Sequence, residues 1–385
     1  MSLSVLIAAG GTGGHMIPAH ALSEELMRRG HKVTLLTDAR GLRFPGLFEA
    51  ADKHVLESAT ASGMNPVAWA KAAVSILRGR RAGRRIAVDA RANAVVGFGG
   101  YPSLPGLLAG VALGLPIVIH EQNAVLGRVN RQLQGRVSAI GLSYATTLRL
   151  DTANEGKAVH TGNPVRPAIL AARDVAFDAP TADKPFRLLV VGGSQGARIL
   201  GRLVPEAVAT LPAELRARLR VEQQCRAEDL SPVLAAYEAA GVEADCQTYW
   251  ADLPERLAKS HLVISRSGAS TMAELMAAGR PAILIPFAAA TDDHQTVNAA
   301  GFVSAGAGML LPEAEANAAK LAGHLRGFMG SPEALQGAAA AARSLGIPDA
   351  AARLADLVEH EVRALARDGA GRGALAAAAG GDRSR

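Results

Sequence analysis

The chain has 385 residues, of which 49% are hydrophobic and only 4% aromatic, and it carries a net charge of +6. This length is typical of two domains, and the aliphatic composition favours buried parallel strands covered by helices. The charge permits an anionic partner, whereas the two cysteines, Cys225 and Cys246, lack the spacing of a metal or redox motif. The uncharged stretch 92–119 is interrupted by glycines and prolines, so we expect no membrane-spanning helix. The N-terminal apolar run is too short for a signal peptide.

The first predicted elements form a βαβ unit. Residues 3–9 are an apolar strand, residues 10–14 are a glycine-rich loop, and Pro18 suits the first turn of a helix that ends before Gly30. Residues 31–37 are predicted as the next strand. A strand, a helix and a second strand in this order indicate a parallel sheet.

The same pattern returns half a chain later. Residues 186–191 are an apolar strand, residues 192–196 (GGSQG) are a second glycine-rich loop, and a helix is predicted from Ala197. This loop shares three glycine positions with the first (GGTGG). Two copies of one strand–loop–helix pattern indicate two similar domains. We therefore predict an α/β protein with two Rossmann-like domains. Residues 163–167 and the polar stretch that follows them to Lys184 are the predicted linker.

The first loop suggests a phosphate-bearing ligand without matching a nucleotide motif. Its glycines would let backbone amides approach an anion, but Met16 stands where a dinucleotide motif has its third glycine, and a P-loop lysine is absent. A tight turn without a ligand is the alternative. His15 lies where the loop meets the helix, and a neutral imidazole there would act as a general base or have only a structural role.

A second anion site is predicted at the sequence RSGAST, residues 266–271. It follows the apolar strand 262–265 and precedes a helix over residues 271–278. Amides and hydroxyls at the start of that helix would hold a pyrophosphate. Glu274 lies one turn into the helix, where it would either bond a ribose or stabilise the helix end.

Polar residues also follow a strand predicted over residues 282–287. They lie beyond its carboxyl end, which is where α/β sheets bind ligands. Asp292, Asp293 and His294 raise the possibility of a metal. Adjacent carboxylates rarely share one ion, and no further carboxylate or histidine clusters nearby in the sequence, so we expect no metal here.

The segment 120–123 (HEQN) places four polar side chains directly after the strand 117–119. Such side chains are costly to bury unless they are hydrogen-bonded or used. Glu121 is therefore a second candidate base, and Asn123 is a candidate for bonding a sugar hydroxyl. The residues Gly99–Tyr101 end another strand on the same side of the predicted sheet.

A helix predicted from Asn65 combines an apolar stripe with basic residues. Trp69, Ala73, Ile76 and Leu77 fall on one face at helical spacing, and Lys71, Arg78, Arg80, Arg81, Arg84 and Arg85 surround or follow them. This pattern is typical of a helix that docks on an anionic membrane surface. An ordinary surface helix with its stripe in the core fits equally well.

Taken together, these motifs resemble the MurG family. Its members transfer N-acetylglucosamine (GlcNAc) from UDP-GlcNAc to the lipid-linked muramyl-pentapeptide precursor of peptidoglycan. The matching segments occur in family order: GGTGGH at 10–15, GFGGY at 97–101, HEQNAVLGRVN at 120–130, GNPVR at 162–166, GGSQGAR at 192–198, RSGAST at 266–271 with Glu274, and HQTVNA at 294–299. Each motif is weak alone, but the ordered set is specific.

The resemblance implies a GT-B fold, with two facing Rossmann-like domains. The expected boundaries are 1–162 for an acceptor- and membrane-associating domain, 163–345 for the UDP-GlcNAc domain and 346–367 for a helix that packs back on the first domain. Residues 368–385, rich in Ala, Gly and Arg, are expected to be a disordered tail.

The resemblance also implies site residues and partners. The donor would contact Thr12, Gly13, Gly14, Asn123, Arg166, Ser194, the backbone near Trp250, Ala269, Ser270, Thr271, Glu274, His294 and Gln295. The acceptor would contact Gly100, Tyr101 and Asn130, and no cofactor, metal or nucleic acid is expected. Docking through Trp69, Ile76, Leu77, Arg78, Arg80 and Arg81 would place the enzyme peripherally on the cytoplasmic face of the bacterial plasma membrane, in cell-wall synthesis and division.

The implied reaction is a single displacement with inversion, in which the acceptor's C4 hydroxyl attacks the sugar and either His15 or Glu121 takes the proton. Three other functions are alternatives to this transferase. One is a UDP-GlcNAc epimerase of the same architecture, and another is an NAD-dependent oxidoreductase, which Asp38 at the end of the second strand supports slightly. The third is a basic nucleic-acid-binding module, although no such motif is present.

Overall fold

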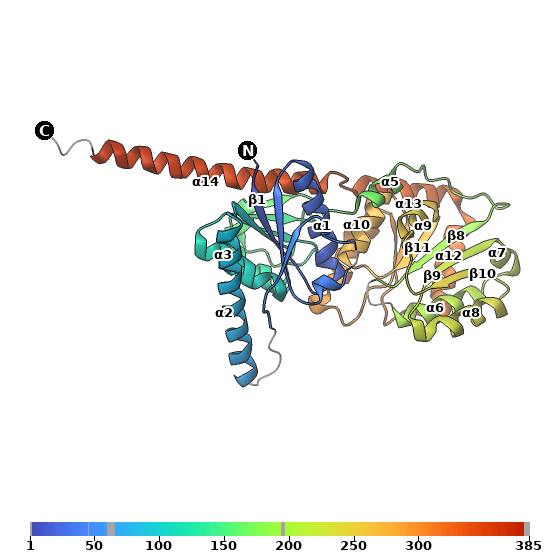
Figure 1. Cartoon of the computed structure of the whole chain (residues 1–385). Coiled ribbons are helices and arrows are strands. Elements are labelled where there is room, and N and C mark those ends of the chain that lie inside the picture. Colours follow the sequence, from blue (N-terminus) through green and yellow to red (C-terminus); the bar gives the residue numbers. More distant parts are fainter. Residues whose placement is uncertain (1, 45, 60–65, 194–196, 381–385) are drawn as a thin grey trace. The chain divides into compact units, whose positions relative to one another are not determined.

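The computed structural model describes residues 2–44, 46–59, 66–193 and 197–380, and at Pro66 and residues 368–380 it describes the backbone alone. The chain forms two compact units, shown in Figure 1. The first comprises Met1–Gln122, Leu126–Pro164 and Asp349–Arg385, and the second comprises Asn123–Val125 and Val165–Pro348.

In the described part of the chain, the first unit is built on a seven-stranded parallel sheet with the order β3-β2-β1-β4-β5-β6-β7. Its strands are β1 (Ser4–Ala8), β2 (Lys32–Thr37), β3 (Asp52–Val55), β4 (Ala94–Gly97), β5 (Ile117–Glu121), β6 (Ala139–Leu142) and β7 (Ala158–His160). Its helices are α1 (Gly13–Arg28), α2 (Pro66–Asp89), α3 (Leu104–Leu113), α4 (Arg128–Leu133) and α14 (Ala350–Gly380). The strand order reverses between β1 and β4, and α/β sheets bind ligands beyond such a switch point.

The strand β1 shows why a continuous apolar run forms the centre of this sheet. Leu6 and Ile7 are both fully buried, and because successive side chains point to opposite faces they enter two different hydrophobic clusters. Full burial of such a side chain contributes about 1.5–3 kcal/mol. Helices covering both faces therefore stabilise a strand that has no polar face.

The helix α14 completes the core of the first unit. Its residues Leu354, Leu357 and Val358 are buried in the cluster that also contains Val5 and Ile7 of β1. The apolar face that this helix covers belongs to a sheet whose strands all precede Val165, where the main part of the second unit begins.

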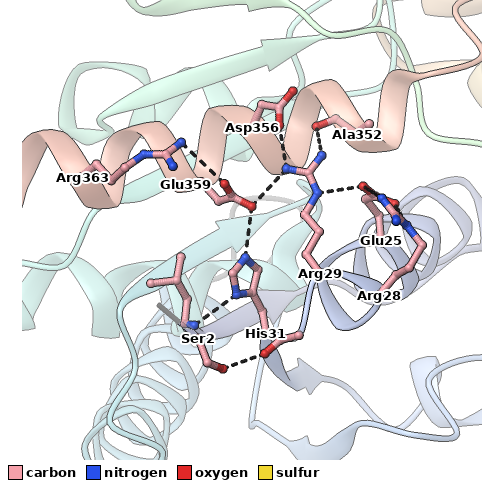
Figure 2. A network of polar contacts seen from close by, with 11 residues as sticks. Ser2, Glu25, Arg28, Arg29, His31, Ala352, Asp356, Glu359 and Arg363 are labelled. Atoms are coloured by element: carbon pink, nitrogen blue, oxygen red, sulfur yellow. Dashed lines mark hydrogen bonds and ion pairs between the residues drawn. The ribbon is translucent and has the colours of Figure 1, made fainter.

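A polar network beside this core joins α14 to the end of α1, as Figure 2 shows. Arg29 donates to Asp356 (2.6 Å), to Glu359 (3.0 Å) and to the carbonyl of Ala352 (3.0 Å). His31 bonds Glu359 through Nε2 at 3.1 Å. Burial alone would raise the pKa of Glu359, but its bonds to His31 and Arg29 outweigh burial and hold that pKa below its usual value.

In the described residues, the second unit is built on a six-stranded parallel sheet with the order β10-β9-β8-β11-β12-β13. Its strands are β8 (Phe186–Val191), β9 (Leu219–Gln224), β10 (Glu243–Gln247), β11 (Leu262–Ser265), β12 (Ala282–Leu284) and β13 (Gly308–Leu310). Its helices are α5 (Pro167–Arg173), α6 (Arg198–Ala209), α7 (Ala213–Arg218), α8 (Leu230–Ala239), α9 (Leu253–Lys259), α10 (Ala269–Ala278), α11 (His294–Ser304), α12 (Ala318–Gly330) and α13 (Pro332–Leu345). The order reverses between β8 and β11.

Some element bounds differ from those expected. The helix α1 begins at Gly13, so Pro18 lies in its second turn rather than its first. The strand β12 ends at Leu284, three residues early, and α10 begins at Ala269, two residues before the expected start. Local sequence predicts the ends of helices and strands poorly, because tertiary contacts decide where an element stops.

The end of the chain also differs from expectation. The helix α14 continues to Gly380, whereas an irregular tail was expected from residue 368. The alanines in this stretch are strong helix formers, and each glycine costs only about 1 kcal/mol relative to alanine. In the described part of the chain, helices long enough to cross a bilayer are not sufficiently apolar to do so.

Candidate active site

The turn after β1 is packed so closely that its glycines are required. A Cβ on Gly10 would lie 2.7 Å from Cβ of Pro102, and Gly11 has φ +83. The carboxylate of Asp38 accepts from the amides of Gly11 (3.2 Å) and Gly41 (3.0 Å) and from Arg40 (2.7 Å). Burial tends to raise the pKa of Asp38, but these bonds outweigh it and lower the pKa. Asp38 thus holds the turn, which weakens the dinucleotide-binding interpretation.

The turn leads directly into α1 and places His15 at the switch point. Thr12 is the N-cap residue, and Gly13, Gly14 and His15 form the first turn of the helix. The imidazole Nδ1 of His15 lies 2.9 Å from Oε1 of Gln122, which directly follows β5. This contact connects the loop after β1 with the end of β5 in the first unit.

Glu121 has a different environment from His15. Its Oε2 accepts from the backbone amide of Gly127 (2.7 Å) and from Nδ2 of Asn130 (2.8 Å), and its side chain is buried. Asn130 also donates to the carbonyl of His120 at 3.2 Å. These bonds fix the turn between β5 and α4, so the carboxylate and Asn130 support the backbone around the site.

Two glycines after β4 allow the backbone to approach His15. A Cβ on Gly100 would lie 3.2 Å from Nε2 of the imidazole, and one on Gly99 would lie 3.7 Å from its Cε1. Both residues have positive φ, +76 at Gly99 and +69 at Gly100, which is a conformation that favours glycine. Tyr101, which follows these glycines, packs half-buried against the hydrophobic core of the first unit.

In the second unit, Arg166 and Glu274 are brought together. Arg166, the N-cap residue of α5, donates from Nη2 to Oε1 of Glu274 at 2.9 Å. Burial raises the pKa of the Glu274 carboxyl, and the charge and hydrogen bond of Arg166 oppose that shift. The pair presents one cationic and one carboxylate side chain beside the first turns of α10.

The N-terminus of α10 is suited to an anion. Gly268 is the N-cap residue and provides no side-chain cap, and the first turn of a helix leaves backbone amides without intrahelical partners. In the described part of the chain the buried hydroxyl of Ser270 has no hydrogen-bond partner. Ser270 and Thr271 therefore offer hydroxyls and amides where the helix dipole favours negative charge.

The residues after β12 are fixed by Gln295 and Glu313. Gln295 Oε1 accepts from the amide of Phe287 (2.9 Å), and its carbonyl accepts from Ser267 (2.7 Å). Glu313 accepts from Arg266 (2.7 Å) and from the amide of Ala288 (3.2 Å). The loop after β12 is thus tied to the loop that leads into α10.

His294 and Trp250 are held by local contacts. His294 bonds the carbonyl of Thr291 through Nδ1 at 2.7 Å. The indole of Trp250 is buried in the second unit's core, with Arg256 4.7 Å from its ring centroid. Ser194 lies outside the described residues. Within the described residues, no group of three or more His, Cys, Asp or Glu side chains is arranged to hold a metal ion.

Asn298 is a candidate site residue that the sequence did not reveal. It is fully buried, accepts from the amide of Ala124 (2.8 Å), and donates to Asn123 (3.1 Å) and to the carbonyl of Ser267 (3.1 Å). The segment Asn123–Val125 therefore belongs to the second unit, although it follows β5 of the first. The motif HQTVNA contains this asparagine, but its three partners are distant in sequence.

Glu313 is absent from the predicted site, and for His120 and Gln122 the sequence predicts a buried polar position after a strand but no partner. His120 donates from Nε2 to the carbonyl of Gly162 at 2.9 Å and is fully buried. Their place directly after an apolar strand indicates that such groups need partners, but the partners Gly162 and His15 are distant in sequence.

His120 leads to a prediction about stability and pH. Burial lowers its pKa from 6.5 to about 4, although the bond to Gly162 acts in the opposite direction. The unfolded chain therefore binds a proton at a higher pH than the native chain does. As the pH falls from 6.5 towards 4, the unfolding free energy should fall by about 3 kcal/mol. Urea unfolding of the wild type and of His120→Gln checks this, because the variant should lack this part of the pH dependence; identical pH dependence would contradict it.

Comparison with known proteins assigns this architecture to a class. The family descriptions "Glycosyltransferase family 28 N-terminal domain" and "Glycosyltransferase family 28 C-terminal domain" match residues 5–141 and 187–354. Two Rossmann-like domains with parallel sheets and these two matches define a glycosyltransferase of the GT-B fold, and the predicted fold class is confirmed.

Several relatives narrow the class further. A protein of Zymomonas mobilis named UDP-N-acetylglucosamine--N-acetylmuramyl-(pentapeptide) pyrophosphoryl-undecaprenol N-acetylglucosamine transferase is 52% identical over 363 residues, covering 93% of this chain and 92% of its own. A protein of the same name from Sphingopyxis alaskensis is 50% identical, covering 92% of this chain and 90% of its own. The crystal structure of Acinetobacter baumannii MurG matches with a TM-score of 0.73 and 28% identity over 93% of this chain and 99% of that one. The chain belongs to the MurG family.

A likeness to an epimerase concerns the fold alone. The structure of a putative UDP-N-acetylglucosamine 2-epimerase from Listeria monocytogenes matches with a TM-score of 0.65 but only 17% identity. At that identity the two chains share an architecture, and the match gives no support to epimerase activity in this chain.

Proposed function

We infer that this chain is a UDP-GlcNAc-dependent glycosyltransferase that moves GlcNAc to the lipid-linked muramyl-pentapeptide, converting lipid I to lipid II in peptidoglycan synthesis. The observation that carries this function is the 52% identity over 93% of the chain to a transferase whose name states that reaction. The substrates are UDP-GlcNAc and undecaprenyl-pyrophosphoryl-MurNAc-pentapeptide.

The second unit binds the donor in this proposal. The diphosphate rests against the first turn of α10, where Ser270 and Thr271 provide hydroxyls and amides and Ala269 starts the helix. Glu274 bonds the ribose, and its partner Arg166 balances the buried carboxylate. Gln295 and His294 at the start of α11 bind the sugar or phosphates, with Ser194 and the backbone near Trp250 completing the nucleotide site.

The first unit supplies the base. His15 is supported over Glu121 because the Glu121 carboxylate already accepts from Gly127 and Asn130, and these bonds hold a backbone turn. Moving a proton onto Glu121 would weaken both of those bonds. In the first unit, Thr12, Gly13 and Gly14 line the substrates, and Gly100, Tyr101 and Asn130 shape the acceptor region. Asn123, which belongs to the second unit, also lines the substrates.

The proposed chemistry is a single displacement with inversion at the anomeric carbon. The acceptor's C4 hydroxyl oxygen bonds to C1 of GlcNAc, and its proton passes to His15. The bond from C1 to the β-phosphate oxygen breaks on the opposite side, and UDP leaves with that electron pair. The positive end of α10, equivalent to roughly half a charge, stabilises the departing diphosphate.

Transfer is tested with radiolabelled UDP-GlcNAc, offered with and without lipid-linked acceptor. We expect label in the lipid fraction only when the acceptor is present, and His15→Ala provides the inactive control. Conversion of the nucleotide sugar to its epimer without acceptor would indicate the epimerase instead. Absence of lipid labelling by the wild-type protein would refute the proposed transferase.

We also propose peripheral docking on the cytoplasmic face of the plasma membrane, through the helix α2. Val74 and Leu77 are 47% and 51% exposed and share a face with Arg78 and Arg81. Trp69, near the start of the helix, is 56% exposed. This surface combines apolar side chains with cations, as membrane-docking helices do.

One residue expected on this surface lies elsewhere. Ile76 packs half-buried against the first unit's core, whereas Leu77 does not belong to that core. Gly79 explains which face packs, because a Cβ there would lie 2.1 Å from the carbonyl oxygen of Glu57. The helix therefore lies tightly against the unit at Gly79, and the opposite face carries Val74, Leu77 and Arg81.

The double variant Val74→Ser/Leu77→Ser should bind phosphatidylglycerol vesicles at least about tenfold more weakly, since burying one such side chain in an apolar phase contributes about 1.5–3 kcal/mol. Vesicle co-sedimentation measures the change. The control Val159→Ser/Val175→Ser removes two similarly exposed valines that lie outside α2 and should bind as the wild type does. Equal binding by both double variants would contradict docking through α2.

A further inference from the structure

His15 is the first member of a chain of hydrogen-bonded polar groups that runs into the first unit. Its Nδ1 lies 2.9 Å from Oε1 of Gln122, and Nε2 of Gln122 lies 3.0 Å from Nδ1 of His120. Nε2 of His120 lies 2.9 Å from the carbonyl oxygen of Gly162. Gln122 and His120 are both buried, so water does not substitute for these partners.

Backbone carbonyls at two points fix the direction of these bonds. The carbonyl of Gly162 can only accept, so Nε2 of His120 must carry a proton. The carbonyl of His120 can also only accept, and it lies 2.9 Å from Nε2 of Gln122. That contact sets the orientation of the Gln122 amide, with its nitrogen inward and its oxygen towards His15.

The buried imidazole stays neutral. Burial lowers the pKa of His120 to about 4, so at neutral pH this ring carries one proton, on Nε2. Its Nδ1 is therefore an acceptor for the Gln122 amide nitrogen. The remaining group, Oε1 of Gln122, can only accept, which requires a proton on Nδ1 of His15.

We infer that Gln122 and His120 are positioning residues that hold neutral His15 as the Nδ1–H tautomer, leaving the lone pair on Nε2 to take the acceptor's hydroxyl proton. The inference rests on the proposed role of His15 as the base. We call the hydrogen-bonded series His15, Gln122, His120 and Gly162 the relay. Neutral imidazole in water favours a proton on Nε2, so the relay reverses that preference. The Nε2 edge lies beside Gly99 and Gly100, neither of which has a side chain.

The tautomer is measured directly by ¹⁵N NMR of the full chain labelled at histidine, without substrates. The resonances of His15 are assigned by their loss in His15→Gln. We expect its Nδ1 to have the shift of a protonated ring nitrogen and its Nε2 that of an unprotonated one at a pH where the ring is neutral. A proton on Nε2 in the wild type would overturn the relay, whether or not the protein transfers GlcNAc.

The variant Gln122→Met removes both hydrogen-bonding groups at nearly constant length. We expect kcat to fall about 10–100-fold, with KM for UDP-GlcNAc unchanged, because a misdirected tautomer impairs the base and the proposed donor site lies in the second unit. The NMR signature of His15 should shift towards the Nε2–H form. Unchanged kcat together with an unchanged signature would overturn the proposal.

A matched control and a second pair of variants separate positioning from stability. Gln134→Met removes a buried glutamine that bonds Asp151 and Arg131 in the same unit, and it should leave kcat and the tautomer unchanged. His120→Asn keeps an acceptor near the position of Nδ1, whereas His120→Leu keeps none. We expect the asparagine variant to retain at least about tenfold more activity than the leucine variant; equal activity with the wild-type tautomer in both would contradict the relay.

Discussion

Replacing His15 with alanine is expected to lower kcat by about 10²–10⁴-fold, the contribution typical of a positioned general base. The affinity for UDP should be unchanged, since the side chains proposed to hold the nucleotide are in the second unit. Single-turnover rates with lipid-linked acceptor measure the chemical step, and calorimetric titration with UDP measures binding. The surface histidine His54 provides a matched control, because His54→Ala should leave both quantities unchanged.

The variant Glu121→Gln separates the two candidate bases. It removes one charge but keeps a side chain that can accept from Gly127 and Asn130, so we expect a small loss of stability and a small effect on kcat. If Glu121→Gln lowers kcat more than His15→Ala does while remaining fully folded, Glu121 and not His15 is the base.

Replacing Asn298 with alanine should lower the unfolding free energy of the second unit by about 3–5 kcal/mol, because three hydrogen bonds are lost and buried partners are left unsatisfied. The buried partners are the amide of Ala124 and the carbonyl of Ser267, and the third lost bond is to the half-buried side chain of Asn123. Affinity for UDP should also fall, since Ser267 directly precedes the N-cap residue of α10.

Urea unfolding followed by the fluorescence of Trp250 in a Trp69→Phe background reports on the second unit alone. Asn317→Ala is the matched control, because Asn317 caps α12 by accepting from Lys320, and loss of an exposed cap costs about 1 kcal/mol. If Asn298→Ala is no more destabilising than this control, Asn298 does not anchor the segment from Asn123 to Val125.

The two sheets could be predicted because their signals are local. Each first strand is an apolar run followed at once by glycines and a helix, so the repeat at residues 10–14 and 192–196 was sufficient to indicate two Rossmann-like domains. The strand, turn and helix around the proposed anion site at α10 could also be predicted, since they are contiguous in the sequence.

The features that could not be predicted depend on distant contacts. The approach of His15 to Gln122 depends on the order β1-β4-β5, which no pattern near residue 15 contains. The grouping of Asn123–Val125 with the second unit depends on one asparagine 174 positions beyond Ala124. On α2, helical spacing placed Ile76 and Leu77 on one stripe, but the close approach at Gly79 decides which of them is buried.

The packing of α14 has a consequence for how the protein is made. The chain leaves the ribosome from its N-terminus, yet the cluster around Val5 and Ile7 is completed by Leu354, Leu357 and Val358. All seven strands of that sheet emerge while the helix that covers one of its apolar faces has still to be translated. The unit that is translated first is therefore the last to complete its core. While the second unit is being translated, the nascent chain needs protection from aggregation.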